Sequence, residues 1–104
     1  MPSIKALNVN HPEHQENLNK NKYEIIREAI LICLSNVDEL SFPDLEDQVR
    51  DHLLRNKVSM ELFPKPGSVR WYTKAVQLDL EARGEIERVP KQVPLRFRRI
   101  IKKG

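Results

Sequence analysis

The sequence predicts an α+β, mainly α domain in which three helices precede a small C-terminal β-sheet. Three segments carry apolar residues at helical spacing, which predicts the helices. Gly84 follows the third segment, at the point where a helix end favours a left-handed residue. Two alternating segments then flank the proline-bounded stretch 90–94, which predicts a two- or three-stranded β-hairpin wing. A helix, a glycine stop and a basic hairpin in this order are typical of a winged helix-turn-helix.

The length of 104 residues allows one domain with a modest core. We expect the winged-helix domain to span residues 21–101, with a basic tail over residues 102–104. Residues 1–20 are rich in Asn and His and low in apolar residues, so we expect a flexible or loosely docked arm. The apolar runs are too short to span a bilayer and no secretory signal is evident, so we expect a cytoplasmic protein without membrane contact.

The first helix is expected to begin near Asn21 and to bury one apolar stripe. The stripe consists of Tyr23, Ile26, Ile30, Cys33 and Leu34. Ile25 and Ile32 widen the apolar surface beyond this stripe. We therefore expect this helix to be well buried or partly shared with a partner.

A short strand is expected at residues 40–42, before the second helix. Pro43 suits the first turn of that helix, which should end near Arg55. Its buried stripe consists of Leu45, Val49 and Leu53. The following segment should place Met60, Leu62 and Phe63 against the core, and residues 64–67 form a turn signal that interrupts any continuous helix.

The third helix is expected to begin at Ser68, which suits an N-cap. The face predicted to enter the core consists of Trp71, Ala75, Leu78 and Ala82, flanked by Tyr72, Val76 and Leu80. A separate polar face, predicted to be exposed, consists of Arg70, Thr73, Lys74, Gln77 and Glu81. In the wing, Leu95 and Phe97 should point inward, because residues alternate between the two sides of a strand.

The charge of the chain is divided unevenly between its two parts. Residues 1–60 carry seven Lys and Arg against ten Asp and Glu, whereas residues 61–104 carry eleven against five. A basic C-terminal part favours a polyanion, and we expect double-stranded DNA. Arg and Gln can contact base edges, and Lys can contact phosphates. The predicted DNA contacts are Arg70, Thr73, Lys74 and Gln77 on the third helix, and Lys91, Arg96 and Arg98 on the wing.

A protein-interaction winged helix is the alternative hypothesis. Here the broad apolar face of the first helix, together with Met60, Leu62 and Phe63, would form a homodimer or a complex with another protein. A transcriptional regulator or accessory factor that binds DNA would also be expected to work as a homodimer. Winged helices serve both purposes, so the fold alone does not choose between them.

The sequence predicts neither an enzyme nor a metal or cofactor site, and no small-molecule ligand. It contains no phosphate-binding loop and no nucleophile elbow. His11 and His14 flank a proline that prevents helical alignment, and no cysteine accompanies them. Cys33 is the single cysteine and lies in an apolar run, where a small buried side chain is the favoured interpretation.

The span 69–88 resembles the third helix and first wing strand of winged-helix domains. The whole span 11–99 resembles a family of small uncharacterised bacterial proteins. The residues that carry this resemblance are His11-Pro12, Lys22-Tyr23-Glu24, Leu62-Phe63-Pro64 and the stretch from Trp71 to Gly84. The resemblance implies a winged-helix fold and brings no assigned activity.

Overall fold

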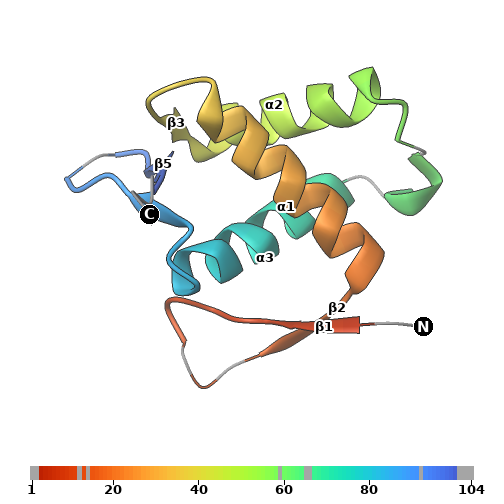
Figure 1. The fold of residues 1–104 in the computed structure, drawn as a ribbon, viewed down its shortest axis with the longest axis horizontal. Coiled ribbons are helices and arrows are strands. Elements are labelled where there is room, and N and C mark those ends of the chain that lie inside the picture. The colour runs from red at the N-terminus through yellow and green to blue at the C-terminus, as the bar shows by residue number, and fades with distance from the viewer. Residues whose placement is uncertain are drawn as a thin grey trace.

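The computed structural model describes residues 3–11, 13, 15–58, 60–64, 67–91 and 93–100. In this part of the chain the fold is α+β, with three helices and two small antiparallel sheets (Figure 1). The elements are β1 (Ser3–Ala6), β2 (Glu16–Asn19), α1 (Lys20–Ser35), β3 (Leu40–Ser41), α2 (Phe42–Arg55), the 3-10 turn η1 (Met60–Leu62), α3 (Ser68–Ala82), β4 (Ile86–Arg88) and β5 (Arg96–Arg99). Over the described residues, no helix combines the length and the apolar character needed to cross a membrane.

Helix α1 lies between α2 and α3 and packs against both (Figure 1). Its predicted stripe is confirmed, because Tyr23, Ile26, Ile30, Cys33 and Leu34 are all buried. The stripe of α2 is confirmed as well, since Leu45, Val49 and Leu53 are fully buried. Both helices have a side-chain cap: Asn19 accepts a hydrogen bond from the Lys22 amide, and Ser41 accepts one from the Asp44 amide.

The three-stranded sheet has the order β3-β5-β4, so the last strand lies between the other two. Phe97 of β5 is opposite Leu40 of β3 and Arg88 of β4, and its ring is fully buried. Leu95 was expected to point inward with Phe97, and this is wrong: its side chain is 41% exposed. Leu95 precedes β5 and is fixed through its backbone, because its carbonyl accepts a hydrogen bond from the Phe42 amide at 3.1 Å.

The N-terminal segment forms a β-hairpin, which differs from the loosely docked arm that its composition predicts. Strands β1 and β2 pair in register, with Ser3 opposite Asn19 and Ala6 opposite Glu16. The hairpin packs on α1 and α3 and buries Ala6 and Leu18. The docking combines these two buried apolar side chains with the bond from the Leu7 amide to Asp79 of α3, although the segment as a whole is polar.

The boundaries of α3 depend on two glycines with left-handed backbone. Gly67 is the N-cap, with φ of 82°, and Ser68 is the first helical residue rather than the expected cap. Gly84 lies beyond the C-terminus with φ of 74°, so the predicted glycine stop is confirmed. The Glu85 amide then donates to the Leu80 carbonyl at 2.9 Å, which turns the chain into the wing.

Candidate functional site

Helix α3 is rotated relative to the orientation that its sequence predicts. Thr73 and Gln77 were expected on an exposed face, and this is wrong because both are fully buried. Trp71 was expected in the core, and this too is wrong because its side chain is 49% exposed. The stripe that enters the core consists of Val69, Thr73, Val76 and Leu80. The outward face therefore carries Trp71, with Ala75, Leu78 and Ala82 on the same side.

Asp79 is the centre of a buried polar network that holds this orientation. Its carboxylate accepts a hydrogen bond from the Tyr23 hydroxyl of α1 and another from the Leu7 amide, at 2.8 Å. The Arg83 guanidinium pairs with both carboxylate oxygens at 2.9 Å. Burial, followed by the neighbouring Asp79, raises the pKa of Tyr23 well above its usual range. One carboxylate thus ties α3 to α1 and to the N-terminal hairpin.

Gln77 belongs to a second polar group at the junction of α3 and the wing. Its side-chain amide donates to Glu81, whose other carboxylate oxygen pairs with Arg88 of β4 at 2.7 Å. Burial raises the pKa of Glu81, and the bond from Arg88 opposes that shift. Among the described residues, the Gln77 carbonyl oxygen and the Thr73 hydroxyl have no hydrogen-bond partner. The two side chains face the interior and cannot contact a nucleic acid in this conformation.

Arg70 and Lys74 remain on the accessible side of α3. Arg70 is exposed and lies 3.6 Å from a Glu46 carboxylate oxygen of α2. The Lys74 ammonium lies 5.2 Å from the centre of the Phe42 ring, a cation–π distance. Burial, followed by the charge of Arg88, lowers the pKa of Lys74. Of the four predicted helix contacts, the structure brings these two to the surface.

Two of the three basic side chains predicted as wing contacts are paired with acidic side chains of the same chain. Arg96 lies 2.6 Å from Glu39, and Arg98 lies 2.7 Å from Glu87. Such exposed pairs contribute little to stability, but they offset the positive charge. Lys91 is exposed at the wing turn, and none of the ion pairs among the described residues includes it. The wing therefore presents less positive charge than its composition predicts.

An apolar groove lies between α3 and the N-terminal hairpin, and we call it the α3 groove. It encloses about 170 Å³ and is lined by Ala6, Leu7, Asn8, Glu16, Trp71, Lys74, Ala75 and Leu78. The sequence alone does not predict this groove, because one of its walls is the hairpin. The sequence signal for the groove is the apolar stripe that contains Trp71, Ala75 and Leu78, which the sequence predicts to face the core.

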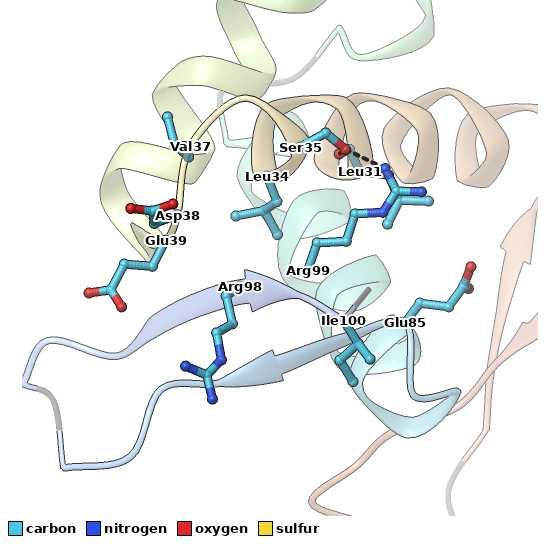
Figure 2. Close-up of a pocket in the computed structure, with 10 residues that line it drawn as sticks. All are labelled: Leu31, Leu34, Ser35, Val37, Asp38, Glu39, Glu85, Arg98, Arg99 and Ile100. Carbon is cyan, nitrogen blue, oxygen red and sulfur yellow. Dashed lines mark hydrogen bonds between the residues drawn. The ribbon is translucent and has the colours of Figure 1, made fainter. Parts of the chain in front are cut away.

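A larger depression lies between the end of α1 and the wing (Figure 2). It encloses about 840 Å³, and the apolar side chains of its lining include Leu31, Leu34 and Ile100. Its charged residues are of both signs: Asp38, Glu39, Glu85, Arg98 and Arg99. Ser35 is engaged in structural bonds, because its hydroxyl donates to the Leu31 carbonyl at 2.6 Å and accepts from Arg99 (Figure 2). This leaves the depression without an activated nucleophile among the residues that line it.

The face of α1 proposed for the alternative hypothesis is only partly accessible. Ile32 is exposed and lines an adjoining depression, whereas Ile25 packs partly buried against the core. Phe63 is buried and Leu62 packs against the core, so these two side chains face the interior. The side chain of Met60 lies outside the described residues.

The described part of the chain includes His11, His52 and the single cysteine, Cys33. Within it, no three His, Cys, Asp or Glu side chains lie close enough to hold a metal ion. Cys33 is a buried free cysteine, and burial raises the pKa of its thiol. His14 and the basic tail 102–104 lie outside the described residues.

Comparison with known families matches residues 3–97 to a family of unknown function, DUF6958. The chain belongs to this family. The expected relationship to a family of uncharacterised proteins is thereby confirmed. The DUF6958 match includes the β1–β2 hairpin as well as the three helices, so the walls of the α3 groove all lie within the family domain. Searches of curated proteins and of solved structures found no match.

Proposed function

We propose that this DUF6958 chain is a winged-helix protein-interaction module that binds its partner with the outward face of α3. The order of elements supports the winged-helix assignment. From α1 onward, the chain runs α1-β3-α2-α3-β4-β5, and the last two strands form a hairpin that pairs with β3. This order is the one expected of a helix-turn-helix with a wing, and under the proposal α3 takes the position of the recognition helix.

The observation that carries the proposal is the character of the outward face of α3. A helix that reads DNA presents polar and basic side chains to the base edges and phosphates. Here the outward face carries a half-exposed Trp71 beside Ala75 and Leu78, and the predicted base-reading residues Thr73 and Gln77 are interior. An exposed aromatic side chain beside an apolar groove is typical of a protein-contact hot spot.

The acidic partners of the wing also support a protein ligand. Glu39, Glu81 and Glu87 lie against Arg96, Arg88 and Arg98. A phosphate backbone would have to displace these carboxylates or approach them closely, and both are unfavourable. A protein surface of mixed charge meets no such obstacle.

The test is a selection of peptides from a random display library on the purified protein. Selected peptides should be rich in apolar and aromatic residues. They should bind the Leu78→Lys variant more weakly than the wild-type protein. Leu54→Lys is the matched control, because Leu54 is an exposed leucine of α2 outside the groove. Trp71 is the single tryptophan, so its emission should shift to shorter wavelength when the groove is filled. Peptides that bind Leu78→Lys as tightly as the wild type would contradict the proposal.

Double-stranded DNA is the second candidate ligand, and the net charge of the C-terminal part favours it. Residues 61–104 carry eleven basic against five acidic residues, and Lys91 is exposed at the wing turn. Under this hypothesis, the triple substitution of Lys91, Arg96 and Arg98 by alanine weakens binding to DNA of any sequence. It also makes the DNA affinity less dependent on salt concentration. An unchanged salt dependence in that variant would remove the wing from the DNA hypothesis.

A further inference from the structure

The depression between the end of α1 and the wing contains an arginine that is held in place by a serine (Figure 2). The Ser35 hydroxyl donates its proton to the Leu31 carbonyl at 2.6 Å, so its oxygen is free to accept from Nη1 of Arg99. A guanidinium has five N–H donors. The side of Arg99 that carries Nε and Nη2 makes no hydrogen bond to another described residue. Two parallel N–H groups on one side of a guanidinium match the two oxygens of a carboxylate.

The other charged side chains of this depression leave Arg99 as the cation available to a ligand. Three of them are paired within the chain: Arg98 with Glu87, Glu39 with Arg96, and Glu85 with Arg27. None of the ion pairs among the described residues includes Arg99. Asp38 is exposed, and Figure 2 shows it beside Glu39, away from the Arg99 guanidinium. The positive charge of Arg99 is therefore not neutralised by a carboxylate of its own surroundings.

The surface next to Arg99 is apolar. Leu31 and Leu34 of α1 line the depression together with Ile100, and Figure 2 shows Leu34 pointing from α1 towards the wing. Val37 extends the apolar lining and is 38% exposed. The volume of about 840 Å³ lies within the range of about 300 to 1,000 Å³ that is typical of small-molecule sites. A fitting ligand combines an apolar body with one group that pairs with a guanidinium.

The charges of the lining favour a ligand with a single negative charge. Asp38, Glu39 and Glu85 all line the depression, and their carboxylates disfavour a phosphate or a nucleic acid, which carries more negative charge. A carboxylate carries one charge and needs one guanidinium. An apolar chain attached to it would cover the leucine side chains.

We propose that this depression binds a small aliphatic monocarboxylate. The carboxylate pairs with the Nε and Nη2 groups of Arg99, and the aliphatic chain lies against Leu31, Leu34 and Ile100. The sequence does not predict such a ligand, because Arg99 and Ser35 are 64 residues apart. Among the described residues, this site and the α3 groove have no lining residue in common. The proposal therefore goes beyond the proposed function, and each can fail without the other.

The first test is an NMR titration of the ¹⁵N-labelled protein with decanoate, kept below the concentration at which decanoate forms micelles. We expect saturable shifts of the Arg99 Nε–H signal and of the Leu34 and Ile100 amides. Decanol is the matched neutral ligand and should bind about tenfold more weakly, because it lacks the charge that pairs with Arg99. The absence of saturable shifts with decanoate would overturn the proposal, as would equal affinity for the two ligands.

Decyl phosphate distinguishes a carboxylate site from a general anion site. It has the same aliphatic chain as decanoate and a larger negative charge. The acidic side chains of the lining should make it bind more weakly than decanoate. Tighter binding of decyl phosphate would overturn the assignment to a monocarboxylate.

The second test removes the guanidinium. Arg99→Gln should weaken decanoate binding by about tenfold and leave decanol binding unchanged, because only decanoate pairs with the charge. Arg99 is exposed, so the variant should keep the wild-type melting temperature. Arg50→Gln is the matched control, because Arg50 is an arginine of α2 that does not line the depression. Unchanged decanoate affinity in Arg99→Gln would overturn the proposal, and so would an equal loss of affinity for both ligands.

Discussion

The two faces of α3 both depart from the usual division, in which polar side chains are exposed and apolar ones are buried. The inward face buries Thr73, Gln77 and Asp79 at 0% exposure, whereas the outward face leaves Trp71 half-exposed. Buried polar groups are tolerated where they find partners, and Asp79 finds three. Exposed aromatic side chains beside a groove are typical of surfaces that contact another protein. The inward face therefore maintains the structure, and the outward face is the one available to a ligand.

Leu80 and Leu78 provide the sharpest comparison of the two faces, because they are the same residue two positions apart. Leu80→Ala should destabilise the protein by about 3 kcal/mol, since Leu80 is fully buried in the core. Leu78→Ala should change stability by less than about 1 kcal/mol, because Leu78 borders the open groove. Urea unfolding followed by circular dichroism measures both, and equal losses would contradict the assigned orientation of α3.

Asp79→Asn tests whether the inward polar network holds the helix and the hairpin together. The change removes the charge that pairs with Arg83. Because an amide has a single acceptor oxygen, it also leaves either the Tyr23 hydroxyl or the Leu7 amide without its acceptor. We expect a loss of about 2 kcal/mol in the free energy of unfolding, together with faster hydrogen exchange at the Leu7 amide. Asp38→Asn, at an exposed position, is the control and should have little effect.

Gln77→Leu asks whether the second polar group on the inward face contributes to stability. The substitution keeps the volume nearly constant and removes a buried carbonyl oxygen that has no partner, but it also removes the hydrogen bond to Glu81. These effects oppose each other, so the change in the free energy of unfolding should stay within about 1 kcal/mol. A loss well above that value would mean that the bond to Glu81 is essential to the junction of α3 and the wing.

Cys33 should show the smallest effect of all. The thiol is buried on α1, and burial raises its pKa, so the reactive thiolate is scarce at neutral pH. Labelling by a thiol reagent should be slow in the native protein and fast in denaturant. Rapid labelling of the native chain would show that the packing of α1 opens readily.

Local sequence signals predicted most of the fold. The stripes of α1 and α2, the short strand before α2, the stop at Gly84 and the hairpin after it all depend on neighbours in the chain. The orientation of α3 did not follow from such signals, because α3 has two apolar stripes of similar strength. The stripe that enters the core is the one that contains Thr73. Which stripe faces inward depends on the hydrogen bonds of Asp79 with Tyr23 and Leu7, which lie 56 and 72 residues away in sequence.

The candidate site was harder to predict for the same reason. The α3 groove needs the hairpin as a wall, and the docking of that hairpin depends on two buried side chains, Ala6 and Leu18, in an otherwise polar segment. The number of charges on the wing follows directly from the sequence. The ion pairs of the wing with Glu39 and Glu87 do not, because each pair joins two separate elements of the fold. Composition shows how many charges a segment carries and does not show which of them are neutralised.

The most direct test of the central claim is a titration of the protein with a fluorescent mixed-sequence DNA duplex at low salt. DNA anisotropy and Trp71 emission are recorded together. Because the outward face of α3 is assigned to a protein ligand, Trp71 emission should stay constant, with at most weak binding through the wing. Binding at micromolar concentration or tighter that falls steeply with salt and changes Trp71 emission would place DNA on α3 and contradict this account.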